Sequence, residues 1–163
     1  MDVAFRCALP NETEAVSEIL QEANAWTAQH GPALWQAEQI CPESLQQDVE
    51  AAIFYFLKCD GLLSGVFKIL DQDPGVWPEV TSGESLFLHK VALRRAFAGK
   101  GLVSHIVGFS RLMALERNCN YLRLDCETRR HSLKQIYMKE GFVWKEDFCI
   151  GNLMISKFEM RVR

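Results

Sequence analysis

The strongest constraint in this sequence is a glycine cradle, Ala98-Gly99-Lys100-Gly101-Leu102-Val103, that stands between a stretch with strand character and a stretch with helix character. A helix that begins directly after glycines leaves backbone N–H groups without acceptors, and its dipole places partial positive charge at the same end. Both properties favour phosphate oxygens as ligands. The glycine cradle therefore predicts a strand, a turn and a helix that together bind a phosphate-bearing ligand.

Two familiar phosphate-binding patterns do not fit the glycine cradle. The P-loop pattern needs a glycine five residues before the Gly-Lys pair and a Ser or Thr after it, but Arg94 and Gly101 occupy those positions. The dinucleotide pattern needs a third glycine where Ser104 stands. The cradle is therefore neither a P-loop nor a dinucleotide fingerprint.

Composition narrows the class of protein. The 163 residues suit one domain covering 1–163, and 48% hydrophobic with 24% charged residues is ordinary for a soluble globular chain. A net charge of −3 argues against a nucleic-acid-binding surface. The longest apolar run, Ala51–Leu57, is too short for a membrane helix, and the first residues lack the pattern of a signal peptide. We therefore expect a cytoplasmic protein with neither a nucleic-acid nor a membrane partner.

Cysteine and histidine spacing gives no metal signature. The six cysteines contain no C-x-x-C pair, so we expect reduced structural thiols. His30, His105 and His131 have no metal-ligand partners in the sequence. We therefore expect no metal site.

Hydrophobic periodicity and turn residues predict a mixed α/β domain. Strands are expected over 3–9, 53–58, 62–70, 85–93, 121–126, 142–149 and 153–162. Helices are expected around Ala15 to Trp26, from Pro42, after the glycine cradle and over 132–140. The order is β-α-α-β-β-β-α-β-α-β-β, and the segment from Ser85 to Cys126 has the form of a β-α-β crossover.

Three motifs in this order resemble those of the GNAT superfamily of acetyl-CoA-dependent N-acetyltransferases. They are Leu88–Leu93 with the glycine cradle, Tyr121–Cys126, and Tyr137–Phe142. The resemblance implies a mixed, mostly antiparallel central sheet flanked by helices, with a diverging strand pair that holds the cofactor. It also implies acetyl-CoA as the co-substrate.

The resemblance implies where acetyl-CoA binds. In the family the pantetheine pairs with a strand whose backbone is free on one side, which corresponds here to Val91, Ala92 and Leu93. The pyrophosphate is implied to lie on the backbone N–H groups of Gly99, Lys100, Gly101, Leu102, Val103 and Ser104. The chain departs from the commonest family pattern at three positions. Ala98 replaces Arg or Gln, Val103 replaces Gly or Ala, and Arg130 stands where many members have Asn.

The same resemblance suggests catalytic residues. Tyr137 matches a family tyrosine that donates a proton to the leaving thiolate. Asp125 stands where some family members carry a catalytic Glu and is the first candidate for the general base. Apart from the resemblance, His89 is the second candidate because it shares a strand face with Val91 and Leu93, and Glu84, which precedes that strand, is a weaker third. A backbone N–H near Leu93 is expected to polarise the thioester carbonyl. Because the sequence has no convincing Cys-His pair, we expect direct attack by the amine, although Cys126 beside Asp125 leaves a covalent route as an alternative.

The acceptor is expected to be a primary amine of a small molecule or a peptide. Trp35 and Trp77 lie in two loops that are expected to border its pocket, where an aromatic face attracts an ammonium group. A homodimer is common in the family. Two alternatives stay open: an enzyme for another acyl group, and a non-enzymatic module that binds acyl-CoA or regulates a partner.

Overall fold

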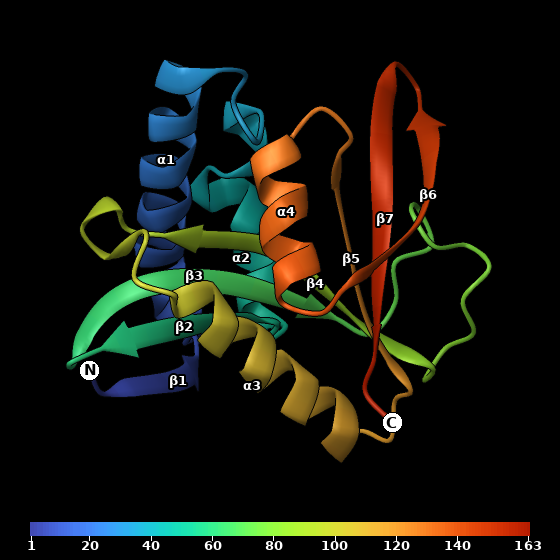
Figure 1. Cartoon of the computed structure of the whole chain (residues 1–163). Helices are drawn as coiled ribbons and strands as arrows, with labels where there is room; N and C mark the ends of the chain where they lie inside the picture. Colours follow the sequence, from blue (N-terminus) through green and yellow to red (C-terminus); the bar gives the residue numbers. More distant parts are fainter. The chain divides into compact units, whose positions relative to one another are not determined.

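Strand β4 (Ser85–Leu93) runs through both of the units into which the chain divides. The computed structural model describes residues 1–163 (Figure 1). The first unit contains 1–69 and 90–106, and the second contains 70–89 and 107–163. Helix α3 (Leu102–Glu116) is likewise shared. Whether the chain is one domain, as the sequence predicts, stays a prediction.

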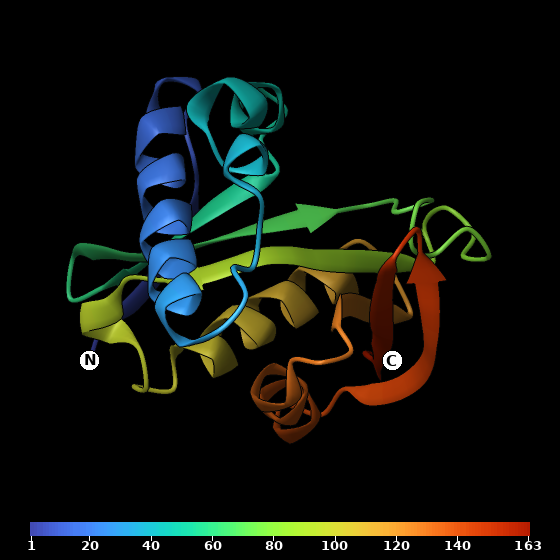
Figure 2. The same cartoon turned by 90° about the horizontal axis from the view of Figure 1, so that it is seen from above.

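The first unit is an antiparallel set of strands with two helices on one face. Its strand order is β1-β2-β3-β4, in which β1 pairs with β2 and β2 with β3 in antiparallel fashion. Figure 2 shows α1 and α2 on the same face of these strands. The elements are β1 (Val3–Cys7), η1 (Pro10–Glu12), α1 (Thr13–His30), η2 (Ala37–Gln39), α2 (Pro42–Glu50), β2 (Phe54–Cys59), β3 (Leu62–Leu70) and η3 (Arg95–Phe97).

The core of the first unit lies between those helices and the strands. Apolar residues at helical spacing on α1, including Val16, Ile19 and Leu20, are fully buried. Phe54 and Phe56 on β2 face them, since alternate residues of a strand share a side. Burying large side chains of this kind stabilises the fold by roughly 1.5–3 kcal/mol each.

The second unit holds the only parallel pairing in the sheet. Its strand order is β4-β5-β7-β6, in which β4 runs parallel to β5 and the other pairs are antiparallel. Figure 1 shows β6 and β7 as a long hairpin. The further elements are β5 (Tyr121–Glu127), α4 (His131–Lys139), β6 (Val143–Ile150) and β7 (Leu153–Arg161). The prediction of a mostly antiparallel sheet flanked by helices is confirmed.

Local turn chemistry accounts for several element boundaries. Asp60 and Gly61 have φ of 50° and 80°, as the predicted tight turn between β2 and β3 requires. Gly141, with φ of 100°, follows α4 and ends it. The predicted strand Ser85–Leu93 and the predicted helix start at Pro42 are both observed. No helix in the structure has both the length and the apolar character needed to cross a membrane.

A glycine on β3 sets how closely β4 can approach. A Cβ atom at Gly65 would lie 2.7 Å from Leu93 Cδ2 and 2.9 Å from the Ala92 carbonyl oxygen. The backbone carbonyl cannot move without shifting β4. Just beyond this point the Arg94 N–H donates to the Ser64 carbonyl at 2.9 Å. The absence of a side chain at Gly65 therefore allows the end of β4 to pack closely against β3.

Gly65→Ala is expected to lower the free energy of unfolding by about 1–3 kcal/mol, because the added methyl group overpacks the β3–β4 contact. Denaturant unfolding measures the change. Gly108→Ala is the control, since a Cβ at Gly108 in α3 meets nothing within 4 Å. That variant is expected to gain up to about 1 kcal/mol from helix propensity. Equal losses in the two variants would contradict the account.

Candidate active site

The glycine cradle adopts the backbone conformation that its glycines allow. Gly99 and Gly101 both have φ of 75°, in the left-handed region that favours glycine. Helix α3 begins at the next residue, Leu102, so the N–H groups of its first turn point out of the helix start. The Ser104 N–H donates to the Gly101 carbonyl at 3.2 Å. A Cβ atom at either glycine would meet no protein atom within 4 Å. The cradle is therefore an open helix start that can accept an anionic ligand.

The strand that leads to the cradle loses its partner part-way along. β4 and β5 pair only at Ser85–Tyr121, Leu86–Leu122 and Phe87–Arg123, although the strands continue to Leu93 and Glu127. Lys90 has φ of 49°, an uncommon conformation for a residue with a side chain, and it interrupts the regular strand geometry. The end of the ladder leaves backbone groups of β4 without bonds from β5. A peptide-like ligand can use such groups.

The basic residues around the cradle differ in their availability. Arg94 forms an ion pair with Glu22 of α1 at 2.8 Å. The Arg95 guanidinium lies 3.8 Å from the centre of the Trp26 ring, and its backbone N–H donates to Glu22. Lys100 is exposed and lies near the Phe97 ring. The two arginines thus fasten the cradle to α1, and Lys100 is the residue of the three best placed to meet a ligand phosphate.

In the second unit, buried cations fasten the loop between β3 and β4. Trp77 is 4% exposed, with Arg123 5.2 Å and Lys157 4.8 Å from its ring centre. Lys157 also forms ion pairs with Glu79 of the loop and Glu146 of β6, both at 3.1 Å. The loop is thereby held against β5 and β7.

The fastened loop brings Asp73 to two residues that the sequence named as candidate bases. The His89 Nε2 lies 2.9 Å from Asp73 Oδ2, and these atoms and a carboxylate oxygen of Asp125 all lie within 4.8 Å of one another. The His89–Asp73 contact is an ion pair when the imidazole is protonated. Asp73 Oδ2, His89 Nε2 and Asp125 Oδ1 are all buried without a hydrogen-bond partner. The three side chains form a carboxylate–imidazole cluster that can bind a cation.

The pKa of Asp125 is raised, as expected of a carboxyl buried beside another carboxylate. Burial raises the pKa of its carboxyl, the charge of Asp73 adds to this effect, and His89 and Lys157 oppose it. A carboxylate with a raised pKa is a stronger base than an exposed one. Glu84, the third candidate base, instead forms an ion pair with Arg123 at 3.3 Å. Asp125 and His89 therefore remain the two candidates that the structure brings together.

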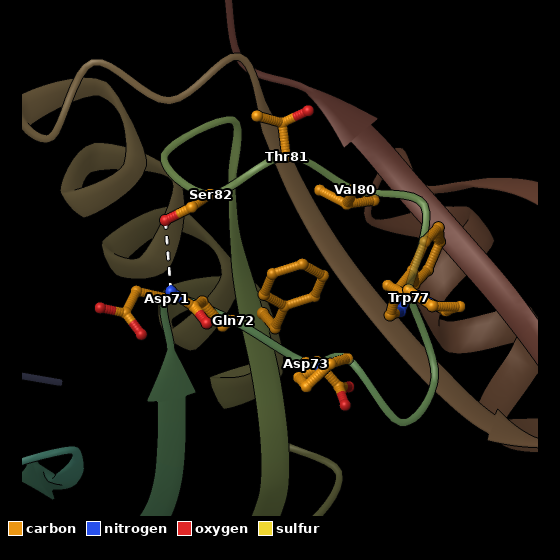
Figure 3. Close-up of a pocket in the computed structure, with 10 residues that line it drawn as sticks. Asp71, Gln72, Asp73, Trp77, Val80, Thr81 and Ser82 are labelled. Carbon is orange, nitrogen blue, oxygen red and sulfur yellow. Dashed lines mark hydrogen bonds between the residues drawn. The ribbon is translucent and has the colours of Figure 1, made fainter.

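Asp73 is the residue that sequence reasoning missed. It lies in an irregular loop with no motif, and sixteen positions separate it from His89, so no spacing rule links the two. Its loop also lines a cavity of about 80 Å³. Figure 3 shows Asp71–Asp73 and Val80–Ser82 on the two limbs of the loop, which Gln72 bridges by donating to Ser82 Oγ at 3.2 Å. The cavity has room for a small polar group beside Asp73.

Tyr137 of α4 is buried in the second unit. Its ring packs on Phe142 and Phe158, with ring centres 6.0 and 6.4 Å away. Burial raises the pKa of the phenol, and the nearby Cys126 and Asp125 raise it further. The phenol is therefore protonated at neutral pH, and the raised pKa makes it a weaker acid than an exposed tyrosine.

Cys126 is a poor nucleophile in this environment. Burial and then the charge of Asp125 raise the pKa of its thiol to about 12. Since the thiolate is the reactive form, almost none is present near neutral pH. This argues against a covalent route through Cys126. All six cysteines are free thiols.

The remaining predicted site residues have structural partners. Arg130 precedes α4 and forms an ion pair with Glu127 at 3.1 Å. Trp35 is half-buried in the loop before α2, where its backbone N–H and carbonyl bond to the Asn24 side chain. Trp77 belongs to the fastened loop and is buried against Arg123 and Lys157. The roles predicted for these three residues stay predictions.

Comparison with known proteins finds similarity to acetyltransferases. No protein-family model matches the chain. The chain is similar to the uncharacterized N-acetyltransferase YesJ of Bacillus subtilis (strain 168), with 23% identity over 150 residues, covering 86% of this chain and 82% of YesJ.

Solved structures show the same likeness. A GNAT-family acetyltransferase from Listeria monocytogenes has a TM-score of 0.80 at 18% identity, covering 98% of this chain and 94% of that chain. The structure of yncA from Salmonella typhimurium with its cofactor acetyl-CoA has a TM-score of 0.74 at 15% identity. The match covers 100% of this chain and 95% of the yncA chain. The chain has the GNAT fold, and the predicted resemblance to the GNAT superfamily is confirmed.

Asp125→Asn is expected to raise the free energy of unfolding at pH 7 by about 1 kcal/mol, because a raised folded-state pKa means that folding disfavours the ionised carboxyl. The gain should disappear below pH 3.8, where Asp125 is protonated in both states. Denaturant unfolding across this pH range measures it.

Asp147→Asn is the control with the opposite sign. Hydrogen bonds from Ser156 and Trp144 lower the pKa of Asp147, so folding favours its ionised form. This variant should lose stability at pH 7, and the loss should fade in acid. A loss of stability at pH 7 in Asp125→Asn would contradict the assignment of Asp125 as a strained, buried carboxylate.

Proposed function

We propose that this protein is an N-acetyltransferase that moves the acetyl group of acetyl-CoA to a primary amine of a small molecule or a peptide by direct attack. The observation that carries the proposal is the glycine cradle, with both glycines left-handed at the start of α3, following a strand whose ladder to β5 stops early. This arrangement occurs in a chain with the GNAT fold. The similarity to YesJ and the acetyl-CoA in yncA support the same activity.

In the proposed complex the first unit supplies the cofactor contacts. Val91–Leu93 bond to the pantetheine, and the N–H groups at residues 99–104 bond to the pyrophosphate. Lys100 adds a positive charge near the phosphates. The open space at both cradle glycines supports this role, because phosphate oxygens have to come close to the backbone.

The carboxylate–imidazole cluster is proposed to handle the amine. An acceptor arrives as an ammonium ion, which two carboxylates and an imidazole attract, and it has to lose a proton before it can attack. Asp125 or His89 takes that proton, directly or through water. Asp73 contributes negative charge to the site but is not one of the two proposed bases.

The transfer itself forms one bond and breaks another. The neutral amine attacks the thioester carbonyl carbon, a backbone N–H near Leu93 stabilises the developing oxyanion, and the carbon–sulfur bond breaks. Tyr137 donates its proton to the leaving thiolate. The acetylated amine loses its second proton, which restores the Tyr137 phenol, and the first proton passes from the base to solvent. The raised pKa of Cys126 supports direct attack over a cysteine intermediate.

A second function, a module that binds acyl-CoA without turnover, is favoured by the cradle's departures from the family pattern. Ala98 lacks a polar side chain, and Val103 adds bulk beside the expected phosphate position. Calorimetry with acetyl-CoA, followed by thiol-release assays over a panel of primary amines, separates the two functions. Binding with turnover supports the enzyme, whereas binding with no turnover on any amine supports the module. Comparing turnover with acetyl-, succinyl- and longer acyl-CoA as donors identifies the acyl group that the enzyme transfers.

Tyr137→Phe is expected to lower kcat by at least about a hundredfold without changing the acetyl-CoA dissociation constant, because it removes only the proton donated to the thiolate. Thiol release measures kcat and calorimetry measures binding. Tyr121→Phe is the matched control, since that ring lies beside the Arg123 guanidinium and has no proposed role in transfer. Equal turnover in wild type and Tyr137→Phe would remove Tyr137 from the mechanism.

A further inference from the structure

Lys90 is strained and half-buried, and no salt bridge satisfies its charge. Its φ of 49° costs roughly 1–2 kcal/mol for a residue with a side chain, and a glycine would relieve it. The Nζ atom lies 5.2 Å from the centre of the Trp35 ring. The attractive contact of the ammonium group is therefore with an aromatic face rather than with a paired carboxylate. Because a glycine would avoid this strain, the lysine side chain is expected to have a functional role at this position.

The charged side chains near Lys90 are already paired with each other. Lys68 on β3 forms an ion pair with Asp48 on α2 at 3.0 Å, which engages the nearest carboxylate. Burial, and then repulsion from Lys68, lower the pKa of Lys90 to about 8, and Asp48 opposes this only in part. A substantial share of the side chain is therefore a neutral amine in mildly alkaline solution. A neutral primary amine is the nucleophile that acetyl transfer needs.

Lys90 stands next in sequence to the backbone proposed to bind the cofactor. Lys90 directly precedes Val91–Leu93, the backbone proposed to bind pantetheine, and both belong to the first unit with the glycine cradle. Trp35 is one of the two aromatic residues, with Trp77, predicted to border the acceptor pocket. The ammonium group found on its face is that of Lys90. The chain thus carries its own amine where an acceptor amine is expected.

We propose that Lys90 is an internal acceptor, whose Nζ is acetylated by bound acetyl-CoA when no external amine is present. The inference rests on the proposed function, because it needs acetyl-CoA on β4. The lone pair of neutral Nζ attacks the thioester carbonyl carbon, the carbon–sulfur bond breaks, and the thiolate takes a proton. Nζ loses one proton, so the products are Nε-acetyl-lysine and free CoA.

Acetylation would change the contact between Lys90 and the Trp35 ring. It removes the positive charge that faces the Trp35 ring and repels Lys68, and it adds an uncharged acetyl group in the same space. The modified protein is therefore expected to use external amines less well. Self-acetylation would act as a brake when acetyl-CoA is plentiful and the acceptor is scarce.

The test is incubation of the whole protein with acetyl-CoA and no amine, followed by intact mass measurement and peptide mapping. We expect one acetyl group, on Lys90, at a rate that does not depend on protein concentration and that rises as pH passes through about 8. Lys90→Arg keeps the positive charge and should remove this modification. Lys68→Arg, the neighbouring control, should retain it. Acetyl phosphate, which lacks the CoA moiety, should instead modify exposed lysines.

The outcomes separate this inference from the proposed function. If acetyl-CoA binds in calorimetry and external amines are acetylated, but Lys90 stays unmodified, the inference is wrong and the enzyme stands. Acetyl groups spread over exposed lysines, with Lys90 not preferred, overturn it as well. If acetyl-CoA does not bind at all, the proposed function and the inference fail together.

Discussion

The early end of the β4–β5 ladder is the constraint on which the proposed chemistry depends. A buried backbone N–H or carbonyl without a partner is costly, so a strand that continues beyond its ladder needs another source of hydrogen bonds. β4 continues for six residues past Phe87, its last pair with β5. Left-handed residues at Lys90, Gly99 and Gly101 then turn the chain into α3. An extended ligand with phosphates at one end fits both the strand and the helix start.

The second unit buries charged side chains, which lowers stability unless each charge has a partner. Arg123 and Lys157 are almost fully buried, yet each has carboxylate partners that offset the cost of desolvation. The same loop that they fasten presents Asp73 to His89 and Asp125. There the partner of Asp73 is an imidazole 2.9 Å away, which is charged only when it is protonated, and Asp125 Oδ1 has no hydrogen-bond partner. Well-paired charges hold the loop, while poorly paired charges remain for a ligand. This division is typical of a site that sacrifices stability for function.

The sequence predicted the elements and the cradle because those features are local. Periodicity, the Asp60-Gly61 turn and the helix-ending Gly141 each depend on a few neighbouring residues. The resemblance to the GNAT superfamily then supplied a role for Asp125, and the position of His89 on the same strand face as Val91 and Leu93 made it the second candidate. Asp73 was not predictable, because its contact with His89 depends on a loop whose path is set by distant ion pairs. The close approach at Gly65 also depends on a contact across the sheet.

The central claim is that the glycine cradle binds the pyrophosphate of acetyl-CoA. Calorimetry of wild type and Gly101→Ala with acetyl-CoA and with S-acetyl-pantetheine, which lacks the pyrophosphate and the nucleotide, tests it most directly. The account predicts that wild type binds acetyl-CoA far more tightly than S-acetyl-pantetheine. It also predicts that Gly101→Ala loses most of this difference, because a side chain at φ 75° is strained and its Cβ enters the open phosphate space. Equal affinity of wild type for the two ligands would contradict the claim.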